Sequence, residues 1–266
     1  MAPSCYAFTI GFSKAAAERP ARARLIVWPE QNLLVFDADE PAFLQRARRL
    51  AADERVYLAM GMGTIHFGDR LPFENKLVLI DPSGQIVTSH LKNRPVIGWE
   101  ASIMRHGHDG VPVVATDIGR MAAAICFEAD FPDFIRQAGQ DNADLLILPV
   151  NEWESIKTLH FQMHVFRAIE NGVPLVRAAA SGLSAAVDPW GRILSMSDFY
   201  AAGDRTMTAQ VPVGRIPTIY ARGGDWFSWL CVAGLGTMLT VALMGTAERS
   251  AMRLMMRDLP VFARTK

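Results

Sequence analysis

Residues 120–150 read RMAAAICFEADFPDFIRQAGQDNADLLILPV, and this stretch decides the fold. An alanine-rich apolar run comes first, then a segment with helical spacing that begins at Pro132, and then a second apolar run. A strand, a helix and a strand in this order are typical of layered α/β domains. We therefore predict strands over residues 120–127 and 144–150, with a helix over residues 132–142 between them.

The same alternation extends to both sides of this stretch. Helical spacing predicts further helices over residues 40–54 and 157–171, and Gly172 follows the second as a residue suited to a left-handed helix end. In the second helix, apolar side chains recur every three or four residues and are expected to form its buried face: Leu159, Met163, Phe166 and Ile169. Short apolar runs predict the other strands, over residues 24–28, 56–62, 76–80, 85–89, 174–180, 184–187 and 205–211.

Two turns in the sequence resemble each other. They read IDPSGQIV at residues 80–87 and VDPWGRIL at residues 187–194. In both, proline fixes one φ angle and glycine permits a left-handed conformation two positions later. We predict that each turn reverses an antiparallel hairpin.

Composition and charge exclude several kinds of protein. The chain has 266 residues, of which 50% are hydrophobic and 20% charged, so it can bury a full core and is not a disordered protein. Lysine and arginine together number 27, as do aspartate and glutamate, and no basic cluster is interleaved with aromatic residues. We expect no nucleic-acid partner.

The cysteines and histidines show no spacing typical of a disulfide framework or a metal site. Cys5, Cys126 and Cys231 lie far apart in the sequence. His160 and His164 have the i, i+4 spacing of a helical pair, but no third ligand is in view. We expect neither a metal nor a cofactor.

A segment near the C-terminus is long and apolar enough to cross a membrane. Residues 226–247 contain no charged side chain, and at about 1.5 Å per residue a helix of this length spans a hydrocarbon core of about 30 Å. Trp226 and Trp229 lie at one end, where tryptophan is enriched in membrane helices. We predict a transmembrane helix here; the alternative is a buried core helix.

The charges after this helix predict its orientation. Residues 248–266 hold more basic than acidic side chains, which indicates a cytoplasmic tail and a main domain, residues 1–225, outside the cytoplasm. The first twenty residues lack the pattern of a signal peptide. We expect a bacterial-type cell-membrane protein, with a tail-anchored protein whose domain is cytoplasmic as the alternative.

Three reactive residues lie where apolar runs end. Glu30 follows LIVWP, Lys92 follows QIVTSHL, and Cys126 lies within MAAAICFE. Strand ends meet at one edge of a layered sheet, so these side chains could converge there. Taken singly, each has a structural explanation, because cysteine packs in cores and lone charges are usually solvated.

The order of several segments resembles that of the carbon-nitrogen hydrolases, the nitrilase superfamily. The segments are LIVWPE, SHLKNRPVIGWE, AAAICFEADFP, ADLLILPVNEW and FRAIENGVPLVRAAASGLSAAVDPWGRIL. Their amino-acid sequences are most similar to those of the apolipoprotein N-acyltransferases within that superfamily. The resemblance runs from about residue 25 to residue 225 and implies an α-β-β-α sandwich followed by one C-terminal transmembrane helix.

The resemblance also implies roles for individual residues. Cys126 would be the nucleophile, Glu30 the general base, and Lys92 the cation that stabilises the oxyanion. Glu100 matches a second glutamate of the family and would orient Lys92 or share a proton with the acyl acceptor. Glu128 matches the family's Cys-aromatic-Glu pattern and is expected to brace the loop without reacting.

Three functions follow from these expectations. The first is N-acyl transfer through a cysteine thioester, from a phospholipid donor in the membrane to a lipoprotein amino terminus or a small amine. The second is hydrolysis of small amides or nitriles by the same residues. The third is a non-catalytic membrane protein, because the membrane-helix bundle that precedes this domain in the acyltransferases is missing here and the N-terminus looks curtailed.

Overall fold

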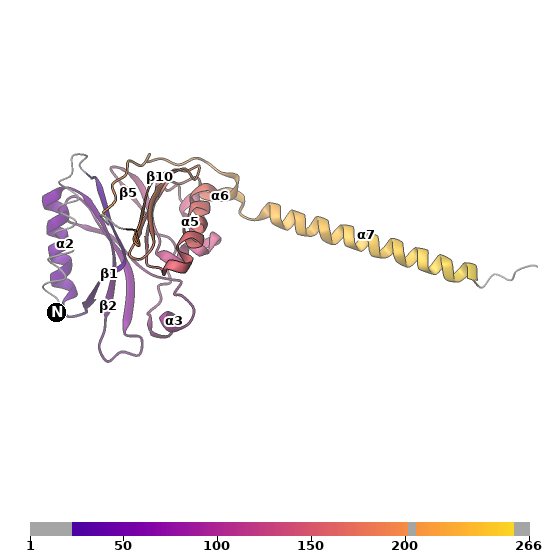
Figure 1. The fold of residues 1–266 in the computed structure, drawn as a ribbon, viewed down its shortest axis with the longest axis horizontal. Coiled ribbons are helices and arrows are strands. Elements are labelled where there is room, and N and C mark those ends of the chain that lie inside the picture. The colour runs from indigo at the N-terminus through magenta and orange to yellow at the C-terminus, as the bar shows by residue number, and fades with distance from the viewer. Residues whose placement is uncertain (1–22, 202–205, 258–266) are drawn as a thin grey trace, which may run out of the picture. The chain divides into compact units, whose positions relative to one another are not determined.

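The computed structural model describes residues 23–201 and 206–257, with side chains described as far as residue 245. The chain divides into two units, residues 1–222 and residues 223–266. The first unit contains two β-sheets and the helices that cover them (Figure 1). The described part of the second unit is one long helix.

The four-stranded sheet has the order β1-β2-β3-β4. β1 (Leu25–Phe36) runs parallel to β2 (Tyr57–Ile65), and β3 (Phe73–Ile80) and β4 (Ile86–Leu91) follow as antiparallel neighbours. Parallel neighbours need a crossover connection, which α2 (Glu40–Glu54) provides. The predicted helix over residues 40–54 is confirmed.

The six-stranded sheet has the order β10-β9-β8-β7-β6-β5. Its central strands are parallel: β6 (Gly119–Ala123), β7 (Leu145–Val150) and β8 (Leu175–Ala179). Two helices connect them, α4 (Pro132–Gln140) and α5 (Lys157–Asn171). Antiparallel strands complete the sheet: β5 (Val113–Thr116), β9 (Leu183–Val187) and β10 (Ile193–Asp198).

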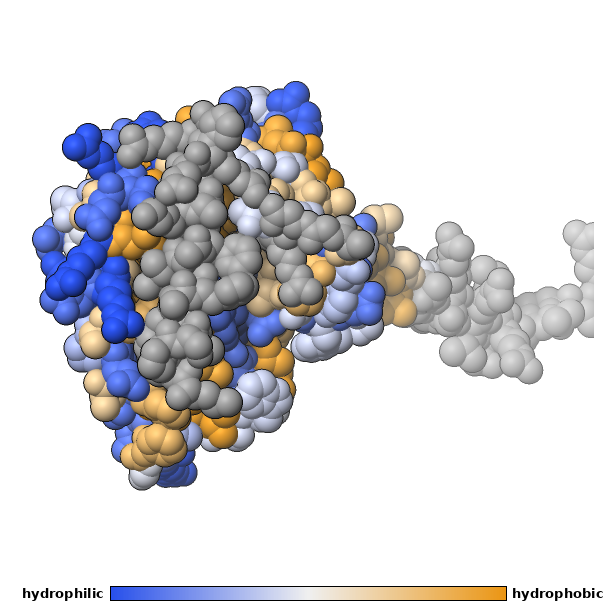
Figure 2. Space-filling model, turned by 60° about the vertical axis from the view of Figure 1, so that its left-hand side comes forward, coloured by the Kyte–Doolittle hydropathy of each residue, from blue (hydrophilic) through white to orange (hydrophobic). Residues whose placement is uncertain are grey.

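Both faces of the first sheet are buried, because alternate residues of β2 point to opposite sides. Leu58 and Met60 pack in one cluster with Phe43 of α2, whose outward side is hydrophilic (Figure 2). Ala59 belongs instead to the cluster that contains Leu148 of the second sheet. The first unit is therefore layered as helix, sheet, sheet and helix, and the predicted α-β-β-α sandwich is confirmed.

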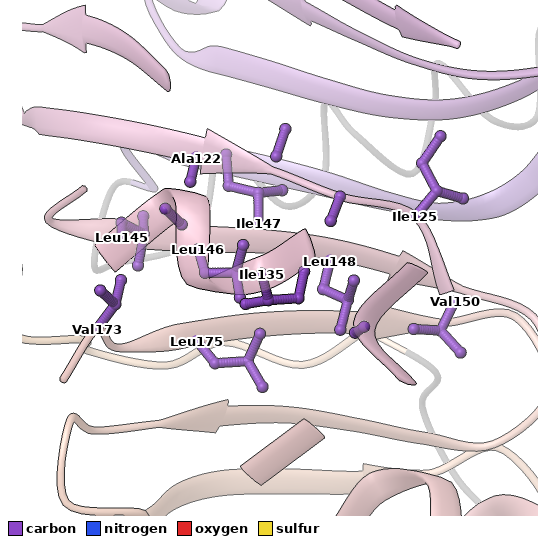
Figure 3. Close-up of a cluster of buried hydrophobic side chains, with 14 of the residues drawn as sticks. Ala122, Ile125, Ile135, Leu145, Leu146, Ile147, Leu148, Val150, Val173 and Leu175 are labelled. Carbon is purple, nitrogen blue, oxygen red and sulfur yellow. The ribbon is translucent and has the colours of Figure 1, made fainter. Parts of the chain in front are cut away.

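The second cluster is centred on β7, which is buried along its whole length. Leu146 and Leu148 lie among the labelled side chains of Figure 3, together with Ile135 of α4 and Leu175 of β8. Each side chain of this size contributes about 1.5–3 kcal/mol when it is fully buried. The segment that contains Cys126 follows directly after β6, at the edge of this cluster.

Both predicted hairpin turns are confirmed. Asp81 and Asp188 each accept two backbone N–H hydrogen bonds from the residues that follow them, all at 2.9 Å. Gly84 and Gly191 adopt the left-handed φ values of 79° and 82° that such turns need. The turns join β3 to β4 and β9 to β10.

Two of the predicted strands differ from the structure, one in its end and one in its presence. The strand predicted over residues 120–127 ends at Ala123, and Cys126 begins a 3-10 helix, η1 (Cys126–Asp130). Apolar composition alone could not separate the strand from the turn that follows it. Residues 206–211 of the strand predicted over 205–211 form no strand, and residue 205 lies outside the described residues.

The predicted buried face of α5 is also wrong. Leu159 and Phe166 are 63% and 58% exposed, whereas the buried residues include His160, His164 and Arg167. Polar side chains face inward here because buried partners on neighbouring elements satisfy them. The helix itself keeps its predicted bounds, and Gly172 ends it with a φ of 62°.

Some short elements were not predicted. They are α3 (Trp99–Ile103), η2 (Glu154–Ile156), α6 (Ile219–Gly223) and the strands β5 and β10. In the second unit, α7 (Trp226–Arg257) contains a window, Trp226–Gly245, that is long and apolar enough to cross a membrane by length and composition.

Candidate active site

Glu30 lies on an irregularity of β1. The pairing of β1 with β2 shifts register between Trp28 and Leu33, and Gln31 has a positive φ of 51°. Gly61 of β2 faces this irregularity, where a Cβ would lie only 2.2 Å from the carbonyl oxygen of Pro29. The close approach of the two backbones leaves the Glu30 carboxylate buried, with 2% of the residue exposed.

Lys92 follows β4 and lies between two carboxylates. Its Nζ is 2.8 Å from Glu30 Oε1, 3.0 Å from Glu100 Oε1 and 3.2 Å from Glu100 Oε2. Glu100 lies in the first turn of α3 and also accepts a hydrogen bond from the backbone N–H of Val96 at 2.6 Å. All three charged side chains are buried, so each needs the opposite charge beside it to offset the free-energy cost of leaving water.

Asn75 of β3 completes this charged group. Its Nδ2 donates to Glu30 Oε1 at 2.7 Å and to Glu100 Oε1 at 3.3 Å, and its backbone carbonyl accepts from the N–H of Lys92. Sequence reasoning missed this residue. Asn75 lies in the polar run Glu74–Lys76 before the apolar residues of the strand, and nothing in that run distinguishes it from its neighbours.

Cys126 begins η1 with a φ of 47°, a conformation that is strained for a cysteine. Its Sγ is 3.5 Å from the backbone carbonyl oxygen of Asn151, and the N–H of the same Asn151 donates to Glu30 Oε2 at 2.8 Å. The thiol also interacts electrostatically with Glu30 and Lys92. The structure therefore brings Glu30, Lys92, Glu100 and Cys126 together, with Asn151 as a link that sequence reasoning missed.

Glu128 braces the segments that carry Lys92 and Cys126. Its fully buried carboxylate accepts hydrogen bonds from the backbone N–H of Asn93 at 2.6 Å and from that of Ile125 at 2.7 Å. His90 Nε2 lies 2.9 Å from the same carboxylate. One carboxylate thus holds the neighbour of Lys92 and the neighbour of Cys126, which agrees with the bracing role expected for it.

Burial and charge keep the Cys126 thiol protonated at rest. Burial and the negative charge of Glu30 raise the pKa of Cys126 well above its usual 9.0, although Lys92 opposes them. Burial alone would lower the pKa of Lys92, but the charge of Glu30 above all raises it. The resting site therefore holds a neutral thiol beside an ammonium, and attack by sulfur needs a base to take its proton.

This protonation state predicts an ultraviolet signature. The absorbance near 240 nm that thiolates show is expected to be equal in the full chain and in Cys126→Ala at neutral pH. A difference should grow only above pH 9.0, the usual thiol pKa, because the raised pKa delays ionisation. A difference of one thiolate already present at pH 7 would contradict this charge assignment.

A group with the composition of a metal site includes Asp130, the last residue of η1, which begins with Cys126. One potential ligand atom from each of Asp130, His160 and His164 lies within 4.8 Å of the other two, so the structure adds a carboxylate to the histidine pair that the sequence did not reveal. However, Arg177 Nε donates to His164 Nδ1 at 3.0 Å, which places the ring hydrogen on Nε2, the atom nearest Asp130. A protonated ring nitrogen has no lone pair for a metal ion, so His164 Nε2 is not a metal ligand in this form. The absence of a bound metal remains a prediction.

A family model described as carbon-nitrogen hydrolase matches residues 8–220 of the chain. The chain belongs to the carbon-nitrogen hydrolase family. Among curated proteins, this hydrolase-family chain is 30% identical over 250 residues to the apolipoprotein N-acyltransferase of Geobacter metallireducens, covering 86% of the chain and 47% of that relative. It is also 30% identical over 233 residues to that of Rhodopseudomonas palustris, covering 82% of the chain and 40% of that relative. The chain thus spans less than half the length of these relatives.

Solved structures confirm the fold of this family member. An amidase from Nesterenkonia sp. AN1 superposes with a TM-score of 0.64 at 19% identity, covering 73% of this chain and 80% of the amidase. A carbon-nitrogen hydrolase from Helicobacter pylori superposes with a TM-score of 0.66 at 16% identity, covering 73% and 80%. At these identities the likeness concerns the fold, and the chemistry must be argued from the site.

Proposed function

We propose that this protein transfers an acyl group through a thioester on Cys126. The observation that carries the proposal is the buried group in which Lys92 lies between Glu30 and Glu100, beside a strained cysteine. Such a group provides a base, a nucleophile and a fixed positive charge in a site that excludes water. A purely structural role would not need a buried lysine and two buried carboxylates around one thiol, because burying charges is costly.

The proposed reaction has two balanced halves. Glu30 takes the Sγ proton as sulfur bonds to the carbonyl carbon of the donor ester, and Lys92 stabilises the negative charge on the carbonyl oxygen. The ester C–O bond breaks and Glu30 returns the proton to the departing alcohol, which leaves an acyl thioester on Cys126. An amine then attacks the thioester and gives a proton to Glu30, and the C–S bond breaks as that proton returns to sulfur.

Glu100 is proposed to orient Lys92 throughout this cycle. It accepts from Nζ through both oxygens and is itself fixed by the N–H of Val96. Lys92 can therefore keep its place when Glu30 becomes protonated and its attraction to Nζ weakens. In this proposal Glu100 orients Lys92, and Glu30 transfers the protons.

A phospholipid donor and a lipoprotein amino terminus are proposed as substrates. The curated relatives named apolipoprotein N-acyltransferase support this choice, and the apolar window of α7 would keep the site near its lipid substrate in a cell membrane. We propose a membrane-spanning helix there with residues 248–266 on the cytoplasmic side, as their basic charge indicates.

Hydrolysis of small amides is the second candidate. The observation that favours it is the shared fold with an amidase whose active-site cysteine carries a covalently added acetamide moiety. The same residues would serve, with water in place of the amine in the second half of the reaction.

The two candidates differ in the adduct on Cys126. The full chain in detergent would be mixed with phospholipid micelles, and its intact mass compared with those of Cys126→Ala and the matched control Cys231→Ala. An acyl-sized increase that hydroxylamine removes, present in the control and absent in Cys126→Ala, is the expected result. An increase that persists in Cys126→Ala would contradict the proposal. Release of ammonia from acetamide with no lipid adduct would favour the amidase, and inertness of a folded chain would favour a non-catalytic protein.

A further inference from the structure

A cluster of polar side chains lies beside the Cys126 group but is not part of it. Its members are drawn from η1, the segment after β7, α5 and β8: Asp130, Glu152, His160, His164 and Arg177. Asp130 is 18% exposed at its side chain, and the other four are buried. Buried polar groups are costly unless they are paired, so the contacts within this cluster indicate its protonation.

His160 lies between two carboxylates. Its Nδ1 is 2.7 Å from Glu152 Oε2, and its Nε2 is 3.0 Å from Asp130 Oδ1. A neutral imidazole can donate through one nitrogen only and would turn a lone pair toward the other carboxylate. A doubly protonated ring is hydrogen-bonded to Glu152 and forms an ion pair with Asp130, so its positive charge is attracted to both carboxylates.

The charges of the cluster balance with His160 protonated. Glu152 and Asp130 carry the two negative charges, and Arg177, whose Nη2 lies 2.7 Å from Glu152 Oε2, carries one positive charge. Burial lowers the pKa of His164 to about 3, so that ring is neutral. His160 supplies the second positive charge, which a buried cluster needs in order to be neutral overall.

The two carboxylates belong to the segments that hold the reacting groups. Asp130 is the last residue of η1, and Cys126 is its first. Glu152 directly follows Asn151, whose carbonyl oxygen lies 3.5 Å from Sγ and whose N–H donates to Glu30. A bridge between these two carboxylates therefore fixes η1, which begins with Cys126, relative to Asn151, which contacts Glu30.

Close packing leaves Glu152 little freedom to move. The backbone N–H of Leu183 lies 3.4 Å from Glu152 Oε1. A Cβ at Gly182 would lie 2.0 Å from the same oxygen, so a residue without a side chain is needed there. Arg177 and the backbone of β9 hold Glu152 in place. Glu152 in turn holds His160, and His160 holds Asp130.

On the basis of the proposed acyl transfer, we propose that His160 is a positioning residue for Cys126. Its protonated ring joins Asp130, at the end of the nucleophile's turn, to Glu152, beside the Asn151 contact of Glu30. This role goes beyond the Glu-Lys-Cys group, because His160 itself touches none of the reacting atoms.

The variant His160→Gln tests the role, since glutamine is neutral and carries both of its N–H donors on one nitrogen, so it cannot present a charged N–H to each carboxylate. The rate constant for Cys126 acylation is expected to fall by about 10- to 100-fold with little change in the apparent affinity for donor lipid, as expected for a small misplacement of a reacting group. His108→Gln, an exposed histidine, is the matched control and should behave as the unchanged chain. An unchanged rate constant in folded His160→Gln would overturn the proposal.

A second readout does not depend on the lipid substrate. Alkylation of Cys126 by fluoroacetamide, followed by intact mass, should slow in His160→Gln and also in Asp130→Asn, which removes the other end of the bridge. If the unchanged chain fails to take an acyl group, the proposed function fails while this alkylation series still tests the positioning role. Equal alkylation rates in all folded variants would refute that role, as would stoichiometric zinc in the unchanged chain that His160→Gln loses.

The pH dependence separates a charged bridge from simple packing. Burial alone would lower the pKa of His160, but Asp130 of η1 and Glu152 after β7 raise it above 6.5. A raised pKa gives stability that is complete below 6.5 and lost as the pH rises through the folded value. The difference in Tm between the unchanged chain and His160→Gln should therefore shrink with rising pH, whereas a packing role predicts a constant difference. Two other groups in the described part of the chain face His160: His164 of α5, whose pKa burial lowers to about 3 so that its ring stays neutral, and the cation of Arg177 of β8.

Discussion

Acylation of Cys126 is expected to slow by about 10²- to 10⁴-fold in the Glu30→Gln variant, because a positioned general base contributes this much. The thiol has a raised pKa and cannot supply a thiolate unaided at neutral pH. Glutamine keeps the size of Glu30 and its oxygen can still accept from Asn75 or Lys92, so the fold should persist. Quenched-flow sampling with intact mass gives the rate constant directly.

Asp53→Asn provides the matched control for this change, since it converts an exposed carboxylate of α2 into an amide. Its rate constant should equal that of the unchanged chain. The pH profile offers a second check, because loss of the base should make the residual rate of Glu30→Gln rise with pH as the thiol ionises. A Glu30→Gln rate within about threefold of the unchanged chain, far less than a general base contributes, would show that another group takes the proton.

The second large effect is expected from Lys92→Met. This variant leaves Glu30 and Glu100 buried without their cation, and breaking a buried pair in this way costs about 3–5 kcal/mol of the free energy of unfolding. For a domain of this size the loss corresponds to a fall in Tm of roughly 6–20 °C, measured on the full chain in detergent. The acylation rate should also fall by about 10²- to 10³-fold, as on removal of an oxyanion donor.

The stability of Lys92→Met should recover in part as the pH falls. Two buried carboxylates without a cation favour their neutral forms, so protonation relieves the variant but not the unchanged chain. In the unchanged chain the raised pKa of Lys92 keeps the ion pairs intact below its usual 10.5, and they are lost only as the pH rises through the higher folded value. A Tm difference that does not vary between pH 5 and pH 8, a range that buried carboxylates can reach, would argue against unpaired carboxylates as the cause.

Lys76→Met is the appropriate control for this experiment. Lys76 also lies between two glutamates, Glu40 and Glu74, but these carboxylates are 19% and 18% exposed and can be hydrated when the lysine is removed. Its Tm should fall less, and its acylation rate constant should stay near that of the unchanged chain. If both lysine variants lost activity equally, the cause would be reduced stability of the fold and not loss of the positive charge that stabilises the oxyanion.

The order of the helices and strands could be predicted from the sequence because each shows its apolar periodicity within its own short segment. α2 and α5 were predicted with their observed bounds, and both Asp-Pro-x-Gly hairpins form as expected. The family resemblance placed Glu30, Lys92, Glu100 and Cys126 in one group, and the structure brings their side chains together. Their catalytic roles await the variants described above.

Buried polar contacts were not accessible in the same way. Asn75 and Asn151 lie in or next to apolar strands, and nothing in their local sequence shows which carboxylate each contacts. A polar face of α5 points inward although apolar residues with helical spacing lie on another face, because Asp130, Glu152 and Arg177 offer buried partners. Periodicity records the apolar residues of a helix but not the partners that lie across the core.

The layered α/β class, the two hairpins and the order of the reactive residue types along the chain all follow from local sequence patterns. Only the tertiary structure decided that Cys126 begins a strained 3-10 turn, that Lys92 lies between two buried carboxylates, and that His160 bridges two more. The reason is physical. A local pattern fixes dihedral preferences and apolar faces, whereas the energy of a buried charge depends on partners that only the folded chain brings within hydrogen-bonding distance.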